Sequence, residues 1–139
     1  MDTLPSRILI TLGSAASIGI GVWHFFVPTL WNWYSYIDPA ATELVVAIRA
    51  INVFFSLTLV LFGLMNLLLA YAPGRSRYAA LVVLGATCIL WSVRVVMQIV
   101  YPQGSASVAL QYGLLLSFTV VLACHAGALA LAIRDRDHA

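Results

Sequence analysis

A few strongly polar side chains interrupt long apolar stretches of the sequence, and two of them are the arginines Arg49 and Arg94. An arginine inside an apolar segment is costly unless an anion, backbone carbonyls or water compensates its charge. Asp38 and Glu43 are close enough in sequence to pair with Arg49, whereas no acidic residue is close to Arg94. We therefore expect Arg94 to meet carbonyl or amide groups, water, a lipid phosphate, a partner chain or an anionic ligand.

His24 and Arg94 are predicted to lie at the same depth. Each is 17 residues from an arginine at the opposite end of its apolar stretch, Arg7 and Arg77 respectively. That separation is about 25 Å along an α-helix. There we predict a polar pocket in which Arg94 takes an anionic or carbonyl group, amide and imidazole groups donate hydrogen bonds, and tryptophans pack on an apolar body. The candidate ligand-binding residues are Trp23, His24, Arg49, Asn52, Trp91, Arg94, Gln98 and Tyr101.

Pro28 lies four residues after His24. A proline has no N–H, so it cannot donate the hydrogen bond that the His24 carbonyl would accept in a continuous helix. One interpretation is that this carbonyl is free beside the imidazole, as at helix breaks that line cavities. The other is that Pro28 simply ends the helix.

A second polar pair, Asn66 and His125, is predicted nearer the other end of the helices, because each lies nine residues from an arginine, Arg75 or Arg134. A hydrogen bond between them is the expected role. His24 and His125 would then differ in depth by about 12 Å. The two ligands of a bis-histidine haem must approach one iron from opposite sides at one depth, so a haem held by two histidines of one chain is disfavoured. A haem with one axial histidine, or with one histidine from each of two subunits, stays open.

The composition places the chain among membrane proteins. Of its 139 residues, 63% are hydrophobic and 9% are charged, which is far from the average of soluble domains. Four apolar stretches, about 8–30, 44–72, 78–101 and 107–133, are each near or above the roughly 20 residues that cross a bilayer as a helix. Short connections containing proline separate them. We predict an all-α polytopic membrane protein, with one domain over residues 1–139 forming a four-transmembrane-helix antiparallel bundle.

Each predicted helix has one face rich in polar and small residues at three- and four-residue spacing. Gly13, Ser17 and Gly21 form a ladder of small residues that favours close approach of two helices. The predicted inward-facing residues are Gly13, Ser17, Gly21, His24 and Pro28; Arg49, Asn52, Ser56, Gly63 and Asn66; Thr87, Trp91, Arg94, Gln98 and Tyr101; and Gln111, Phe118 and His125.

The arginines outside the apolar stretches all fall on one side of the predicted bundle: Arg7, Arg75, Arg77, Arg134 and Arg136. The positive-inside rule then predicts a protein of the inner (plasma) membrane with both termini in the cytoplasm. The first stretch stays apolar past the length of a secretory signal and is expected to be retained. Trp31, Trp33, Tyr34 and Tyr36 would lie at the outer interface, where a short interfacial helix is expected.

The segment His24-Phe25-Phe26-Val27-Pro28, late in the first of four helices, resembles the DoxX-like group of small bacterial membrane proteins. The resemblance covers the helix count and this segment, and implies a four-helix antiparallel bundle. The group takes its name from a subunit of a thiosulfate:quinone oxidoreductase, and most members have no assigned activity. In the second helix Asn52 stands where the group would have an acidic residue.

A second resemblance is to the four-helix glutathione and eicosanoid enzymes. Arg94 and Tyr101 are similar to the arginine and tyrosine on one helix face of these enzymes. The run Arg49-Ala50-Ile51-Asn52 is partly similar to their Arg-Ala-x-x-Asn, one residue shorter. The arginine distribution places this run on the outer side, so this resemblance ranks below the first.

The leading interpretation is a non-catalytic accessory or interaction protein whose outer-leaflet pocket binds a lipid, a quinone or a small anionic molecule. Membrane lipids, further copies of the chain or a larger membrane complex are the expected partners; no nucleic acid and no metal are expected. One alternative is an oxidoreductase subunit in which His24 is a base or haem ligand and Arg94 or Tyr101 activates a substrate. The third interpretation is a channel or carrier, although apolar residues between Asn52 and Gly63 argue against a continuous water-filled path across the membrane.

Overall fold

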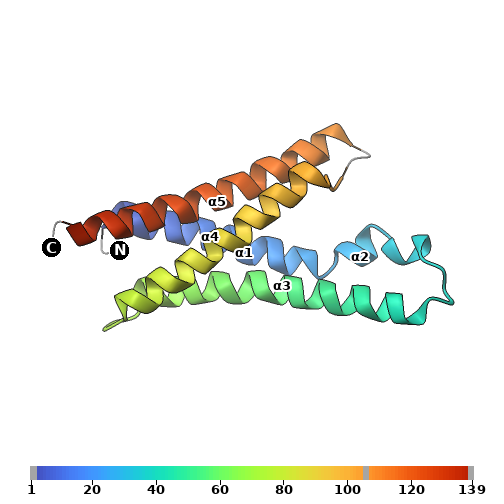
Figure 1. The fold of residues 1–139 in the computed structure, drawn as a ribbon, viewed down its shortest axis with the longest axis horizontal. Coiled ribbons are helices and arrows are strands. Elements are labelled where there is room, and N and C mark those ends of the chain that lie inside the picture. Colours follow the sequence, from blue (N-terminus) through green and yellow to red (C-terminus); the bar gives the residue numbers. More distant parts are fainter. Residues whose placement is uncertain (1–2, 105–106, 138–139) are drawn as a thin grey trace.

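Four long helices account for most of the chain in the computed structural model, which describes residues 3–104 and 107–137, with side chains up to residue 134 (Figure 1). They are α1 (Leu4–His24), α3 (Thr42–Tyr71), α4 (Arg77–Val100) and α5 (Val108–Asp137). A short helix α2 (Val27–Leu30) and a 3-10 helix η1 (Trp33–Tyr36) connect α1 to α3. The described residues form no strand. The all-α prediction is confirmed for these residues, and all four long helices are long and apolar enough to cross a membrane.

Three helix boundaries differ from those expected. α1 begins at Leu4 because Pro5 occupies a first-turn position, where a proline costs no hydrogen bond. It ends at His24, short of residue 30, and the Phe26 N–H bonds back to the Trp23 carbonyl at 3.0 Å. Pro28 accounts for the break, because its ring would clash with the His24 carbonyl in a continuous helix. At the other end of the chain, α5 continues past residue 133 to Asp137.

α1 packs between α3 and α5, and α4 packs on α5 and, less extensively, on α3. The ladder of small residues makes the close contacts of α1. A Cβ atom on Gly21 would lie 2.9 Å from the Ser56 carbonyl oxygen of α3, and one on Gly13 would lie 2.8 Å from the His125 ring of α5. Ser17 donates a hydrogen bond to the Leu59 carbonyl at 3.1 Å. The predicted close approach of helices along this ladder is confirmed.

Most residues predicted to face inward are buried. They include all three members of the ladder on α1, Asn52, Ser56, Gly63 and Asn66 on α3, Thr87, Trp91 and Gln98 on α4, and Phe118 and His125 on α5. The exceptions gather at one end of the molecule: Arg49 and Tyr101 are exposed, and His24, Arg94 and Gln111 are half-buried. The inward faces of the helices are therefore buried along most of their length and are partly exposed at this end.

The second polar pair is not formed as expected. The Asn66 side-chain amide donates to Thr87 Oγ1 at 2.7 Å and to the Phe62 carbonyl at 2.9 Å. His125 is fully buried, and its Nδ1 lies 2.9 Å from the Val121 carbonyl, while its Nε2 has no hydrogen-bond partner among the described residues. The predicted bond between Asn66 and His125 was wrong. A neighbouring helix supplies a hydroxyl to Asn66, and the histidine bonds within its own helix.

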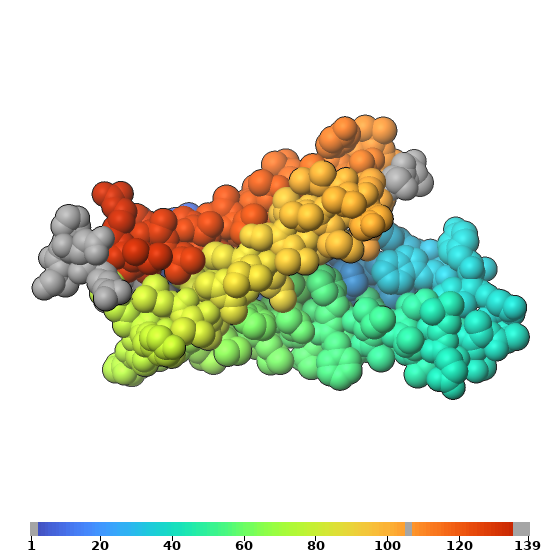
Figure 2. Space-filling view, in the orientation of Figure 1, coloured from blue at the N-terminus to red at the C-terminus, as the bar shows by residue number. Residues whose placement is uncertain are grey.

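α3 and α4 are in contact at one end, where Ala70 packs with Ala80 and Leu84. Toward the other end they diverge, and the space-filling view shows an opening between them (Figure 2). This opening is at the end of the molecule where α1 breaks at His24. The divergence positions the candidate site.

Candidate ligand-binding groove

A groove of about 640 Å³ lies between α3 and α4, at the end where these helices diverge. α3 and α4 supply most of its walls, and η1 and the end of α1 close it. Its lining is mainly apolar, with an imidazole, two amides and a guanidinium among the apolar side chains. The lining residues are His24, Trp33, Ile48, Ile51, Asn52, Phe55, Leu90, Val93, Arg94, Met97 and Gln103. This combination is typical of small-molecule sites.

Arg94 projects from α4 and is half-buried. Its guanidinium carbon lies 4.1 Å from the centre of the Phe118 ring, a cation–π contact. Its nitrogens donate hydrogen bonds to two amide oxygens, those of Gln98, at 3.5 Å, and Gln103. Both acceptors are neutral, and Arg94 makes no ion pair with Asp38 or Glu43, whose side chains are exposed. Some N–H donors of Arg94 therefore have hydrogen-bond acceptors, but no anionic group of the described residues neutralises its positive charge.

Gln98 lies one turn after Arg94 on the same face of α4 and is 1% exposed. Its side-chain amide donates to the Gln103 carbonyl at 3.0 Å and to the Gln111 carbonyl at 3.4 Å, and its oxygen accepts from the Gln103 N–H at 3.4 Å. These hydrogen bonds connect the turn after α4 to α4 and to α5. Gln98 thus holds in place the backbone from which Gln103 reaches Arg94.

His24 closes the groove from the α1 side. Its Nδ1 lies 3.3 Å from Ser56 Oγ, and Ser56 donates its own hydrogen to the Asn52 carbonyl at 2.7 Å. Because a hydroxyl carries one hydrogen, Nδ1 must donate to Ser56. In the neutral imidazole Nε2 is then a hydrogen-bond acceptor. The ring is also held edge-on by Phe55, with centroids 4.7 Å apart, and by Trp33 at 6.3 Å.

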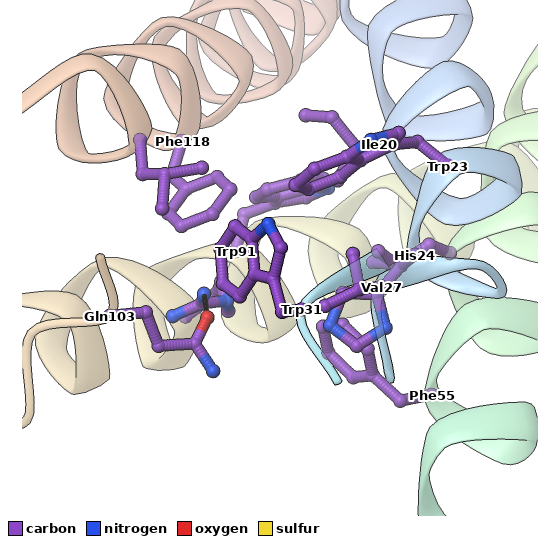
Figure 3. Close-up of a pocket in the computed structure, with 12 residues that line it drawn as sticks. Ile20, Trp23, His24, Val27, Trp31, Phe55, Trp91, Gln103 and Phe118 are labelled. Atoms are coloured by element: carbon purple, nitrogen blue, oxygen red, sulfur yellow. Dashed lines mark hydrogen bonds between the residues drawn. The ribbon is translucent and has the colours of Figure 1, made fainter. Parts of the chain in front are cut away.

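A narrow cavity of about 10 Å³ adjoins the groove, and His24, Phe55, Arg94 and Gln103 line both. Its other walls are half aromatic and half aliphatic, and it has room for about one water molecule. Figure 3 shows Gln103 and Phe118 on one side of this cavity and His24 and Phe55 on the other. The Arg94 to Gln103 hydrogen bond lies at the boundary between cavity and groove.

The structure brings together most of the predicted site residues. His24, Asn52 and Arg94 line the groove, and Trp23 and Trp91 line the narrow cavity next to it. Gln98 lies behind Arg94 as its hydrogen-bond acceptor. The level placement of His24 and Arg94, expected from residue counting, agrees with their shared lining of both spaces.

Two predicted site residues lie elsewhere. Arg49 is exposed, and its guanidinium carbon is 5.1 Å from the centre of the Tyr34 ring instead of in an ion pair with Asp38 or Glu43. Tyr101 is 69% exposed at the end of α4 and lines neither the groove nor the cavity. The helical spacing was right for both, but α3 and α4 have already separated at their positions.

Sequence reasoning missed Gln103, Trp33 and Phe55 as site residues. Gln103 was predicted only to lie in a short connection between two helices, and Trp33 only to be an interfacial aromatic. The proximity of Gln103 to Gln98 in sequence was a usable signal, because a short turn after α4 brings the two amides together. No spacing rule places Phe55, since its contact with His24 depends on how α1 crosses α3.

The two described histidines are far apart. His125 packs against Gly13, which precedes His24 by 11 residues on α1, a separation of about 16 Å along the helix. This geometry does not allow the imidazoles of His24 and His125 in one chain to ligate one iron. Among the described residues, no three side chains of His, Cys, Asp or Glu gather as a metal site.

Comparisons with known proteins leave the family open. No protein-family model, no curated protein and no solved structure matches the chain. Any functional argument therefore depends on the groove itself.

Proposed function

We propose that this chain is a four-helix antiparallel bundle of the bacterial inner membrane that binds an amphiphile in the groove between α3 and α4. The head of the amphiphile, bearing oxygen acceptors as in a lipid or a quinone, would lie at the guanidinium donors of Arg94. Its apolar tail would lie along α3 and α4. The protein would act as an accessory or interaction subunit, and the DoxX-like resemblance is compatible with that role.

The exposed surface of the helices supports membrane insertion. Large apolar side chains stay exposed in the middle of every long helix, as with Leu12 (59%), Leu61 (47%), Ile89 (68%) and Leu116 (66%). In water such continuous apolar surface would promote aggregation. In a bilayer it contacts lipid tails, and the helices satisfy their own backbone hydrogen bonds.

The charge distribution supports cytoplasmic termini. Arg7, Arg75, Arg77 and Arg134 lie near one end of the long helices, and the exposed Asp38 and Glu43 lie near the other. In this orientation the groove is in the outer half of the membrane, and Trp33 and Tyr34 are near the outer interface.

Labelling of single cysteines tests this orientation. In a background with Cys88→Ala and Cys124→Ala, a membrane-impermeant maleimide is expected to modify Ala40→Cys in spheroplasts. Pro73→Cys should react only after permeabilisation. Both positions are exposed and lie in opposite connections. The reverse pattern would show that the termini are on the outside.

The observation that carries the binding proposal is the uncompensated charge of Arg94 at one end of an apolar groove. An arginine so placed costs several kcal/mol at mid-membrane and less toward the interface. A ligand head with anionic or carbonyl oxygens would offset that cost. Because Ile51, Val93 and Met97 line the groove and are strongly exposed, the groove opens laterally, where a lipid-like molecule could enter from the bilayer.

A substitution that fills the groove tests the proposal. Val93→Trp is expected to lower retention of co-purifying amphiphile about tenfold or more, the equivalent of about 1.4 kcal/mol, because the indole would occupy the space of the tail. Native mass spectrometry of the detergent-solubilised protein gives the occupancy, and solvent extraction identifies the ligand.

Val96→Trp is the matched control. Val96 is 56% exposed, against 57% for Val93, and lies on α4 outside the groove. It should retain ligand like the unmodified protein. The proposal is wrong if the unmodified protein binds neither phospholipid nor quinone after delipidation and re-addition, or if both tryptophan variants retain ligand equally.

A further inference from the structure

We propose that the groove selects an amphiphile with an anionic head, and that the Gln103 side chain occupies the place of that head on Arg94 until the ligand binds. This inference rests on the proposed function and adds to it the charge class of the ligand and a specificity-determining residue.

Arg94 has no negatively charged partner among the described residues. Its described partners are the side-chain oxygens of Gln98 and Gln103 and the ring of Phe118. These groups offer lone pairs and π-electron density but no net negative charge. A ligand at Arg94 can therefore supply the charge that the surrounding residues do not.

A neutral ligand head and an anionic one would interact differently with Arg94. A neutral carbonyl, as in a quinone, would exchange one neutral acceptor on Arg94 for another, and such exchanges contribute little net free energy. A phosphate or carboxylate would place an ionised acceptor on the ionised guanidinium, accept two parallel hydrogen bonds from it and neutralise its charge. The same site should thus favour the anion.

Of the two glutamines on Arg94, Gln103 is the one whose side chain a ligand can displace. Gln98 is almost fully buried and holds the turn through the backbone of Gln103 and of Gln111. The Gln103 side chain is half-buried, reaches Arg94 from the turn, and lines the groove. A rotation of this one side chain would release Arg94 toward the groove without breaking the hydrogen bonds that Gln98 makes to the turn.

The experiment uses two substitutions of Gln103 that act in opposite directions. Gln103→Glu places a carboxylate of nearly the same shape beside Arg94, so an anionic ligand must displace a paired charge. Gln103→Ala removes the competing amide. Native mass spectrometry measures the binding of phosphatidic acid, of diacylglycerol with the same acyl chains, and of a short-tailed ubiquinone to the delipidated full-length protein.

The unmodified protein is expected to prefer phosphatidic acid over diacylglycerol about tenfold. Gln103→Glu should lose this preference, and Gln103→Ala should bind phosphatidic acid severalfold more tightly. Gln111→Glu is the control, because it adds the same charge near the same turn, but Gln111 does not line the groove. Oleate, tested in parallel, distinguishes a carboxylate from a phosphate head; preference for either anion over diacylglycerol supports the inference.

Folding is checked by thermal unfolding of the ligand-free protein. Gln103→Glu should unfold at a higher temperature than the unmodified protein, because its carboxylate pairs with Arg94. The inference is overturned if diacylglycerol or ubiquinone binds as tightly as phosphatidic acid, or if Gln103→Glu leaves the preference unchanged. Either result would leave amphiphile binding itself intact. Failure of every amphiphile to bind the unmodified protein would instead refute the proposed function.

Discussion

Gly21→Ala is expected to lower the free energy of unfolding by about 1–3 kcal/mol, the usual cost of overpacking a close contact. The added Cβ would lie 2.9 Å from the Ser56 carbonyl oxygen, 2.9 Å from Leu59 Cβ and 3.0 Å from Val60 Cγ2. Two of these atoms belong to or adjoin the backbone of α3, so a side-chain rotation cannot relieve the clash. α1 and α3 would have to separate.

Gly19→Ala provides a control on the same helix, because a Cβ at Gly19 would meet no atom within 4 Å. It should leave stability unchanged or raise it by about 0.5–1 kcal/mol, the helix-propensity gain of alanine over glycine. Both variants can be compared by chemical unfolding in mixed micelles, followed by circular dichroism. Equal stabilities of the two variants would contradict the close packing of α1 on α3.

The separation of α1 from α3 in Gly21→Ala should also disturb the groove. Gly21 precedes His24 by about one helical turn, and His24 forms a hydrogen bond with Ser56 of α3. Gly21→Ala is therefore expected to reduce ligand retention as well as stability, whereas Gly19→Ala should reduce neither. Loss of stability with full retention would show that the groove does not depend on this helix contact.

Arg94→Gln is expected to weaken ligand binding by about 10- to 100-fold, since hydrogen bonds to charged groups contribute about 1.5–3 kcal/mol. Glutamine keeps a polar side chain on α4 but removes the positive charge and the paired N–H donors of the guanidinium. The measurement is a titration of the delipidated protein with phospholipid, read out by native mass spectrometry.

Arg49→Gln removes the same charge from a neighbouring part of the molecule. Arg49 contacts Tyr34 and does not line the groove, so this variant should bind within about twofold of the unmodified protein. Equal losses in the two variants would indicate a general electrostatic attraction to anionic lipid, and not a site at Arg94.

The inward faces of the helices could be predicted from sequence because residues three and four apart share a helix face. Gly13, Ser17 and Gly21 were assigned to a contact face by spacing alone, and all three are buried. The level placement of His24 and Arg94 followed from the constant rise of an α-helix. Neither argument needed to know which helix packs on which.

Spacing failed where a contact depends on the partner helix. Asn66 and His125 were matched by depth, yet Asn66 bonds to Thr87 on α4 and His125 bonds within α5. Depth fixes the layer in which a side chain lies, but the rotation of each helix decides its neighbours. The same limit applies to Tyr101, which shares the helical spacing of Arg94 but is exposed.

The sequence by itself determined four apolar helices, their inward faces, the break at Pro28 and the common depth of His24 and Arg94, because all of these follow from local backbone geometry and composition. Only the tertiary structure decided that α3 and α4 diverge beside His24, that a groove of about 640 Å³ opens there, and that Gln103 reaches Arg94. These features depend on crossing angles and on a turn conformation, which arise from the packing of whole helices and not from the period of any one of them.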